Sequence, residues 1–368
     1  MRPEISVFIP VYKGIGLLSK NLGNLVTQKI NKEIFVVVDG EPSQESLHAF
    51  KEFGKNANFI FNSKRIGKVN GLNKAVKRAK GNVFVFLDDD VEVANDSRFL
   101  QKIVSEMHDT DILEIKKEVV DNSLLSKMTY CEYVGFNIWA WLLTRFGKRS
   151  PSVNGQAFAI KRNIFDSLNG FRRVIAEDLD MGMRAFLKNY RFKYTDKVKV
   201  YNHVISDFKT WVIQRTRWAT ANAFCVRECF LELIKKSATK YQIFIPALLF
   251  LFPSIILLLS GFLVPKITVY NIVSSISSFL TNFDMSMPIW FLTTVGLNLI
   301  KGISLSIISF AIFSSLSFML SKRVGLEFKL DGFLMYYFFY SVLSMLIQIV
   351  GFTKVFIFND TSSSDWKV

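Results

Sequence analysis

Residues 82–90, NVFVFLDDD, predict a buried strand that ends in three adjacent carboxylates. A short run of β-branched and aromatic residues bounded by turn residues is typical of a strand inside a sheet. Three earlier runs have the same pattern: ISVFIPVY (5–12), EIFVVVDG (33–40) and NFIFN (58–62). Helix-like segments separate these strands, near residues 17–30, 43–53 and 72–79. The alternation predicts an α/β domain with a mainly parallel central sheet and helices on both faces.

Polar side chains gather where these predicted strands end, and ligands of parallel sheets bind beyond the carboxyl ends of the strands. Asp39 ends one strand, and Asp88 and Asp90 end another. Residues i and i+2 of an extended chain point to the same side, so Asp88 and Asp90 can share a ligand. A divalent cation removes their repulsion, and hard oxygen ligands select Mg²⁺ or Mn²⁺. An acidic turn exposed to solvent is the alternative interpretation.

Two other segments carry charged side chains that also have two interpretations. The turn RIGKVNGLN (65–73) places Lys68 beside the start of a predicted helix, where a lysine either meets a phosphate or stays solvated. The segment AEDLDMGMRAFLKNY (176–190) predicts a helix that opens with Glu177 and Asp178. The helix dipole stabilises acids there, yet such a carboxylate can also be a general base that takes a proton from an attacking hydroxyl.

The composition becomes strongly apolar after residue 240. Residues 241–264 contain no charge over 24 positions, which exceeds the roughly 20 residues that span a bilayer as a helix. Two later blocks, 288–320 with only Lys301 charged and 332–353 with no charge, bring the expected number of spans to three. The serine-rich segment 267–283 leaves a fourth span open. The N-terminal sequence has no apolar signal-peptide core, and basic residues precede the first span, so we expect a cytosolic N-terminal domain.

The formal net charge of +15 suits a protein that works on anionic lipid surfaces or phosphate-bearing ligands. No nucleic-acid-binding module accompanies this charge, so nucleic acid is not an expected partner. The three cysteines cannot all pair with one another and are expected to be reduced, as in the cytosol.

The order of the charged segments, followed by apolar spans, resembles that of the membrane-embedded processive-type glycosyltransferases of family 2. That family includes the cellulose, hyaluronan and chitin synthases and, more distantly, the ceramide glucosyltransferases. Six segments carry the resemblance: PVYKG, GKVNGLN, FLDDDVEV, NGQAFAIKRNIFDSLNGF, AEDLDMGMR and QRTRW. The resemblance implies a GT-A type nucleotide-sugar-binding domain in residues 1–205, interfacial helices in 206–240, a transmembrane region in 241–358 and a tail in 359–368.

The resemblance also implies roles for individual residues. Asp178 is the expected general base, with Glu177 before it, and Asp88 and Asp90 stand at the DxD motif that holds Mg²⁺ or Mn²⁺. The residues expected to bind the nucleotide diphosphate sugar are Pro10, Tyr12, Asp39, Lys68, Asp88, Asp90, Gln214, Arg215, Arg217 and Trp218. The sequence departs from the family pattern at Ala176, where a threonine is usual, and at Gly40, where a second acid is frequent.

These features predict an inverting glycosyltransferase of the cell membrane, multi-pass and with a cytosolic catalytic domain. Enclosing a polymer channel takes a ring of helices, and three or four spans are too few unless chains form a homo-oligomer. A lipid or lipid-linked acceptor is therefore favoured over a glycan that is extended and exported by a processive polysaccharide synthase. A non-catalytic membrane scaffold or a transporter is the remote alternative, and the full set of acids argues against it.

Overall fold

The computed structural model describes residues 3–12, 14, 16–120, 123–239 and 294–359, together with isolated positions between 271 and 282. Its centre is an eight-stranded sheet in the order β3-β2-β1-β4-β7-β6-β8-β5. The strands are β1 (Ile5–Val11), β2 (Lys32–Asp39), β3 (Asn58–Asn62), β4 (Val83–Leu87), β5 (Val91–Val93), β6 (Ile112–Val119), β7 (Ala157–Lys161) and β8 (Phe192–Asn202).

The sheet is mixed but mostly parallel. Strand β1 pairs in parallel with β2 and β4, β2 pairs in parallel with β3, and β6 pairs in parallel with β8. Strand β7 runs antiparallel between β4 and β6, and β5 runs antiparallel to β8. The predicted α/β domain with a mainly parallel sheet is therefore confirmed, and the antiparallel strands belong to its second half.

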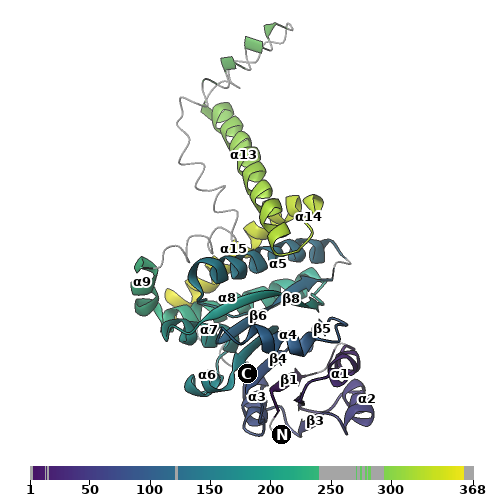
Figure 1. Ribbon diagram of the computed structural model, residues 1–368. Helices are drawn as coiled ribbons and strands as arrows, with labels where there is room; N and C mark the ends of the chain where they lie inside the picture. Colours follow the sequence, from purple (N-terminus) through teal and green to yellow (C-terminus); the bar gives the residue numbers. More distant parts are fainter. Residues whose placement is uncertain are drawn as a thin grey trace.

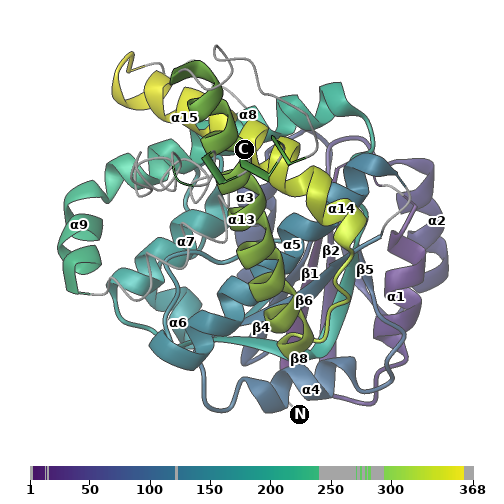
Figure 2. The ribbon, with the colours of Figure 1, turned by 90° about the horizontal axis from the view of Figure 1, so that it is seen from above.

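Helices cover both faces of the sheet, as Figures 1 and 2 show. One face packs against α1 (Leu18–Val26), α2 (Gln44–Phe53) and α4 (Phe99–Glu106). The other packs against α3 (Lys68–Val76), α5 (Leu124–Leu142), η1 (Leu143–Gly147), α6 (Arg162–Ser167) and α7 (Glu177–Leu187). Side chains of β1 alternate between the two cores, with Ile5, Val7 and Ile9 on one side and Phe8 on the other. A strand that is buried on both faces has a nearly continuous apolar sequence, which is why β1 could be predicted from its sequence.

Two helices follow the sheet domain, α8 (Phe208–Glu228) and α9 (Phe230–Thr239). The last described helices are α13 (Thr294–Arg323), α14 (Leu330–Met335), η3 (Tyr336–Tyr340) and α15 (Ser341–Phe356). Among the described residues, two helical stretches are long and apolar enough to cross a membrane, Gly302–Arg323 and Leu330–Phe356. The predicted first span, 241–264, and nearly all of the segment 267–283 lie outside the described residues.

The two apolar stretches differ in how they meet the sheet domain. Helix α13 extends away from the layers, whereas α15 lies against α8 (Figure 1). The helices α8 and α15 approach closely at Gly351, where an added Cβ would lie 2.7 Å from the Cβ of Ala219. The connection between α13 and α14 is also attached to the domain, because Tyr130 donates to the carbonyl oxygen of Glu327 at 2.7 Å. The final helices are thus held to the sheet domain.

Candidate active site

Lys68 lies between two carboxylates at the carboxyl ends of the central strands. Its Nζ is 2.8 Å from Asp88 Oδ1 and 2.7 Å from Glu177 Oε1. Lys68 opens α3, Asp88 follows β4 and Glu177 opens α7, so three elements distant in sequence meet here. Burial opposes the charge of Lys68, but the two carboxylates outweigh it and raise the pKa of Lys68 well above its ordinary value. Lys68 is thus paired with two carboxylates while its side chain stays 35% exposed, and its contact with a phosphate stays a prediction.

Asp39 holds the turn from which Lys68 projects. Its two carboxylate oxygens accept hydrogen bonds from the N–H groups of Ile66 and Gly67, at 2.8 and 2.9 Å. Gly67 has a φ of 91°, a conformation that side-chain-bearing residues rarely adopt, and it precedes the first residue of α3. Asp39 therefore fixes the position of Lys68 at the start of the helix.

Asp178 is oriented by two backbone N–H groups. Its Oδ2 accepts from Gly155 at 2.8 Å, and its Oδ1 accepts from Leu179 at 2.8 Å. A side chain at position 155 would not fit, because a Cβ there would lie 2.6 Å from Asp178 Oδ2. Burial and the neighbouring Glu177 charge raise the pKa of Asp178 to about 6, against the opposing charge of Lys68. A carboxyl group with such a pKa is suited to accept a proton near neutral pH.

The turn at residues 154–156 connects the two acidic segments. The carbonyl oxygen of Gln156 accepts from the N–H of Asp88 at 3.0 Å, and the neighbouring Gly155 donates to Asp178. The side chain of Gln156 accepts from Tyr133 at 2.7 Å and from Asn202 at 3.1 Å. Because the turn is held on both sides, it sets the spacing between Asp88 and Asp178. The NGQ turn belongs to one of the six segments that carry the family resemblance, but its sequence indicates no role of its own.

Asp90 carries a buried carboxylate oxygen, Oδ1, for which the described part of the chain offers no hydrogen-bond partner. Burial, followed by the charges of Asp88 and Asp89, raises the pKa of Asp90 to about 7. Such a group is costly to ionise unless a cation lies beside it. Within the described residues, no three His, Cys, Asp or Glu side chains are grouped to hold a metal ion. Asp88 and Asp90 thus fit a cation that takes its other ligands from a bound molecule.

Pro10 and Tyr12 lie at the end of β1, next to this cluster. Pro10 lines a narrow cavity of about 10 Å³ together with Lys68, Asp88, Gly155, Glu177 and Asp178. The ring of Tyr12 is 45% exposed, and the guanidinium of Arg65 lies 4.2 Å from its centroid. Arg65 was not predicted as a site residue. The basic turn KRIGK was the available signal, but the sequence does not reveal that its arginine reaches β1.

Two residues of the QRTRW segment contact each other on α8, since the guanidinium of Arg215 lies 4.5 Å from the centroid of the Trp218 ring. Arg215 is buried and forms a bidentate ion pair with Glu132 of α5, at 3.1 and 2.6 Å. Cys225 follows Gln214 and Trp218 at helical spacing and contacts the carbonyl oxygen of Ala176 at 3.9 Å. Arg217 is exposed. The structure therefore places Arg215 in a contact between helices and beside the Trp218 ring, and it places Cys225, further along α8, next to the residue that precedes α7.

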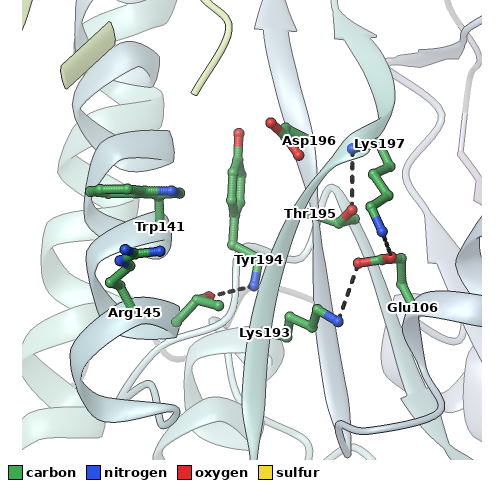
Figure 3. Close-up of a pocket in the computed structure, with 9 residues that line it drawn as sticks. Glu106, Trp141, Arg145, Lys193, Tyr194, Thr195, Asp196 and Lys197 are labelled. Atoms are coloured by element: carbon green, nitrogen blue, oxygen red, sulfur yellow. Dashed lines mark hydrogen bonds and ion pairs between the residues drawn. The ribbon is translucent and has the colours of Figure 1, made fainter. Parts of the chain in front are cut away.

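A second pocket, of about 270 Å³, lies beside the first half of β8 and the end of α5. Figure 3 shows Trp141, Arg145 and Tyr194 on one side of it, and Glu106 paired with Lys193 and Lys197 on the other. None of the predicted site residues lines this pocket. The candidate active site is therefore the smaller cavity, where the acids and Lys68 converge.

The chain belongs to the family described as glycosyl transferase family group 2, whose model matches residues 83–353. A model described as glycosyl transferase family 2 matches residues 6–129. The sheet and its helical layers are those of a GT-A-like domain, as the sequence predicted.

Individual relatives are more distant. The chain is 24% identical over 254 residues to a probable glycosyltransferase, YdaM, of Bacillus subtilis, covering 63% of this chain and 58% of that protein. It is 22% identical over 244 residues to the poly-beta-1,6-N-acetyl-D-glucosamine synthase of Staphylococcus aureus, covering 63% and 57%. The chain therefore spans little more than half of these relatives.

A solved structure has the same fold over nearly the whole chain. It is the mannosyltransferase PcManGT from Pyrobaculum calidifontis, in complex with GDP-Man and Mn²⁺. The match has a TM-score of 0.53 at 15% identity and covers 98% of this chain and 89% of that one. At this identity the likeness concerns the fold alone.

Proposed function

We propose that this protein is an inverting glycosyltransferase that moves a sugar from a nucleotide diphosphate sugar to an acceptor hydroxyl. The observation that carries the proposal is the convergence of Lys68, Asp88 and Glu177 with Asp178 beside them, at the edge of a sheet where ligands bind. Membership of the glycosyltransferase family supports it. So does the binding of GDP-Man by a protein of the same fold.

Asp178 is the proposed general base. The N–H groups of Gly155 and Leu179 hold its carboxylate in one orientation, and its pKa of about 6 leaves it ionised at neutral pH. It removes the proton of the acceptor hydroxyl as the oxygen attacks the anomeric carbon. Attack on the side opposite the departing diphosphate inverts the configuration at that carbon.

Positive side chains receive the charge that grows on the leaving diphosphate. Lys68, which opens α3, donates to one diphosphate oxygen as a point charge. Arg217 is exposed on α8 and presents a planar pair of donors to another oxygen. Asp39 fixes the turn before Lys68, and each of its oxygens retains a lone pair for a donor group on the nucleobase.

Asp88 and Asp90 are the proposed ligands of Mg²⁺ or Mn²⁺, of which Mn²⁺ accompanies GDP-Man in the related structure. The unpartnered Oδ1 of Asp90 supports this assignment. When bound, such an ion supplies charge stabilisation for the diphosphate.

We propose a lipid or lipid-linked acceptor delivered at the cytosolic face of the membrane. Helix α13 exposes isoleucines on more than one side, and α15 packs on α8, which carries Gln214 and Trp218. A molecule anchored in the bilayer would thus arrive next to these side chains, where Trp218 offers a flat apolar surface. A processive synthase that exports its product is the alternative, favoured by the likeness to the poly-N-acetylglucosamine synthase.

The test supplies purified full-length protein with native lipid extract and a panel of radiolabelled nucleotide sugars. Label in the organic phase supports a lipid acceptor, and label in a high-mass aqueous product supports the alternative. Transfer and donor hydrolysis that are absent with every donor would overturn the enzyme assignment. If chelator leaves the rate unchanged and Asp90→Asn binds donor like wild type, the metal assignment is wrong.

A further inference from the structure

Lys117 of β6 is a buried lysine that the proposed mechanism does not use. It is 2% exposed, and its Nζ lies 3.3 Å from Glu114 Oε1 and 3.2 Å from the carbonyl oxygen of Ile115. Glu114 is itself only 7% exposed. A buried ion pair costs desolvation free energy that its attraction barely offsets, so such a pair is weak support for stability alone.

The contacts of Glu114 lead to the general base. Its second oxygen, Oε2, accepts from the N–H of Asn154 at 3.3 Å. The next residue, Gly155, donates its N–H to Asp178 at 2.8 Å. One carboxylate therefore touches the lysine on one side and, on the other, the turn that orients Asp178.

The backbone of Lys117 is also fixed by α5, which covers the same face of the sheet as α7. Asn137 of α5 accepts from the N–H of Lys117 at 3.2 Å and donates to its carbonyl oxygen at 2.8 Å. The pairing of β6 with β8 shifts register just before this point, between Ile115 and Lys116. Burial lowers the pKa of Lys117, and the carboxylates of Glu114, Asp178 and Asp88 oppose that effect, which reflects how close the ammonium lies to the acids.

We infer that Lys117 and Glu114 are a positioning pair, which holds the turn at residues 154–155 and thereby the carboxylate of Asp178. Neither residue needs to touch the sugar or the acceptor. Lys117 fixes the orientation of Glu114, and Glu114 fixes the peptide whose neighbour donates to the base. This inference rests on the proposed transfer activity.

The test compares K117M and wild type for kcat, donor KM and thermal midpoint. K117M leaves the Glu114 carboxylate buried without the lysine ammonium beside it. The carboxylate then either turns away from this position or takes up a proton. We expect kcat to fall about ten- to a hundredfold, since a misplacement of about 1 Å at a reacting group costs up to about 100-fold. The KM for the sugar donor should change less than kcat, because the turn donates directly to the carboxylate of Asp178 through Gly155, whereas it contacts Asp88 only through a backbone hydrogen bond.

The matched control is E106Q, at the other end of the sheet. Glu106 is also buried and also pairs with lysines, Lys193 and Lys197 (Figure 3). This variant should lower the thermal midpoint while kcat stays at the wild-type value. If K117M behaves like E106Q, the Lys117–Glu114 pair is only structural and the inference is wrong.

The double variant E114Q/K117M covers the case in which K117M fails to fold. It carries no charge at either position and retains an amide oxygen for the N–H of Asn154. We expect the double variant to fold and to have a higher kcat than K117M. Two residues that act as one pair should show such coupling, because the second substitution removes the charge that the first left without a partner. A double variant whose fold-loss in kcat equals the product of the fold-losses in E114Q and K117M alone would overturn the inference. Absence of transfer by the wild type is a separate result, and it would overturn the proposed function instead.

Discussion

Asp178 combines a fixed orientation with a raised pKa, and both come from its immediate neighbours. Burial and Glu177 favour the protonated form, while Lys68 favours the ionised form, and the balance is a pKa of about 6. A base acts only when it is ionised. We therefore expect kcat/KM to fall about tenfold per pH unit below pH 6 and to level off above it, which a pH profile of initial rates would measure.

Replacing Asp178 by Asn removes the proton acceptor but keeps the size of the side chain. Transfer should fall about 100- to 10,000-fold, the usual contribution of a general base, with donor affinity within a few fold. Asp166→Asn, at an exposed position of α6, is the control and should have the wild-type rate. Equal loss of donor binding and transfer in Asp178→Asn would identify Asp178 as a donor ligand.

Arg217 and Arg215 are two residues apart on α8, yet their surroundings differ. Arg217→Lys keeps the charge and replaces a planar fork of donors by one ammonium group. A charge-assisted hydrogen bond is worth about 1.5–3 kcal/mol, so we expect the rate of transfer to fall about ten- to a hundredfold without loss of folding. A lysine variant that turns over like wild type would mean that Arg217 does not meet the diphosphate.

At the scale of elements, three helices meet in one buried hydrogen-bonded cluster. Arg215 of α8 pairs with Glu132 of α5, and the hydroxyl of Tyr340 in η3 accepts from Arg215 at 2.8 Å and donates to Glu132 at 2.9 Å. Trp211 of α8 also donates to this hydroxyl, at 3.2 Å. A buried charge pair is costly unless its remaining donors and acceptors are satisfied, and Tyr340 bonds to one nitrogen of Arg215 and one oxygen of Glu132, whereas Arg215 Nε has no partner among the described residues. The cluster thus ties the helix with the QRTRW segment to the final apolar helices.

Tyr340→Phe should therefore destabilise the protein by about 1–3 kcal/mol, because it leaves buried polar groups without a partner. The matched control is Tyr336→Phe. Tyr336 lies one helical turn earlier and is equally buried, but its hydroxyl makes no hydrogen bond within the described residues. Thermal unfolding in detergent would compare the two. Equal midpoints for both variants would contradict the role assigned to the Tyr340 hydroxyl.

At the scale of the whole molecule, a sheet domain rich in charge is joined to helices with apolar surfaces. Ile303, Ile307, Ile308 and Ile312 of α13 are each more than half exposed. Such an apolar surface on more than one side of a helix is costly to expose to water, and a lipid environment removes that cost. The membrane attachment that we propose predicts that the full-length protein remains in the membrane fraction after alkaline carbonate extraction.

Ile308→Asp tests this attachment directly. An aspartate at the centre of a membrane helix costs about 2.5–3.5 kcal/mol for insertion, so the carbonate-resistant fraction should decrease. Leu47→Asp is the control, at a partly exposed leucine on α2 of the sheet domain, and it should leave the fraction unchanged. Unchanged extraction of both variants would show that α13 is not inserted in the bilayer.

The sequence by itself determined the early βα units, the apolar blocks and the segments that carry the acids. These features are local: a buried strand reads as an apolar run of β-branched and aromatic residues, and a spanning helix needs about 20 apolar residues. The strands β1 to β4 were therefore predicted, and the described apolar helices begin and end within a few residues of the predicted blocks. The antiparallel pairing of β7 with β4 and β6 was not predicted. The direction in which a strand pairs depends on where the chain returns after α5, and that is a property of the tertiary structure.

Only the tertiary structure decided which charged side chains meet. Lys68, Asp88 and Glu177 are up to 109 positions apart, and nothing in their own segments indicates that one ammonium lies between the two carboxylates. The same holds for Arg215. Its motif predicted a contact with the nucleotide diphosphate sugar, whereas in the structure its carboxylate partner is Glu132 on α5. In the sequence, Lys117 and Glu114 have no feature that sets them apart from other strand residues. The fold buries both of them and brings Glu114 to the N–H of Asn154. A charge acquires its role from burial and from its nearest opposite charge, and both are properties of packing between distant segments.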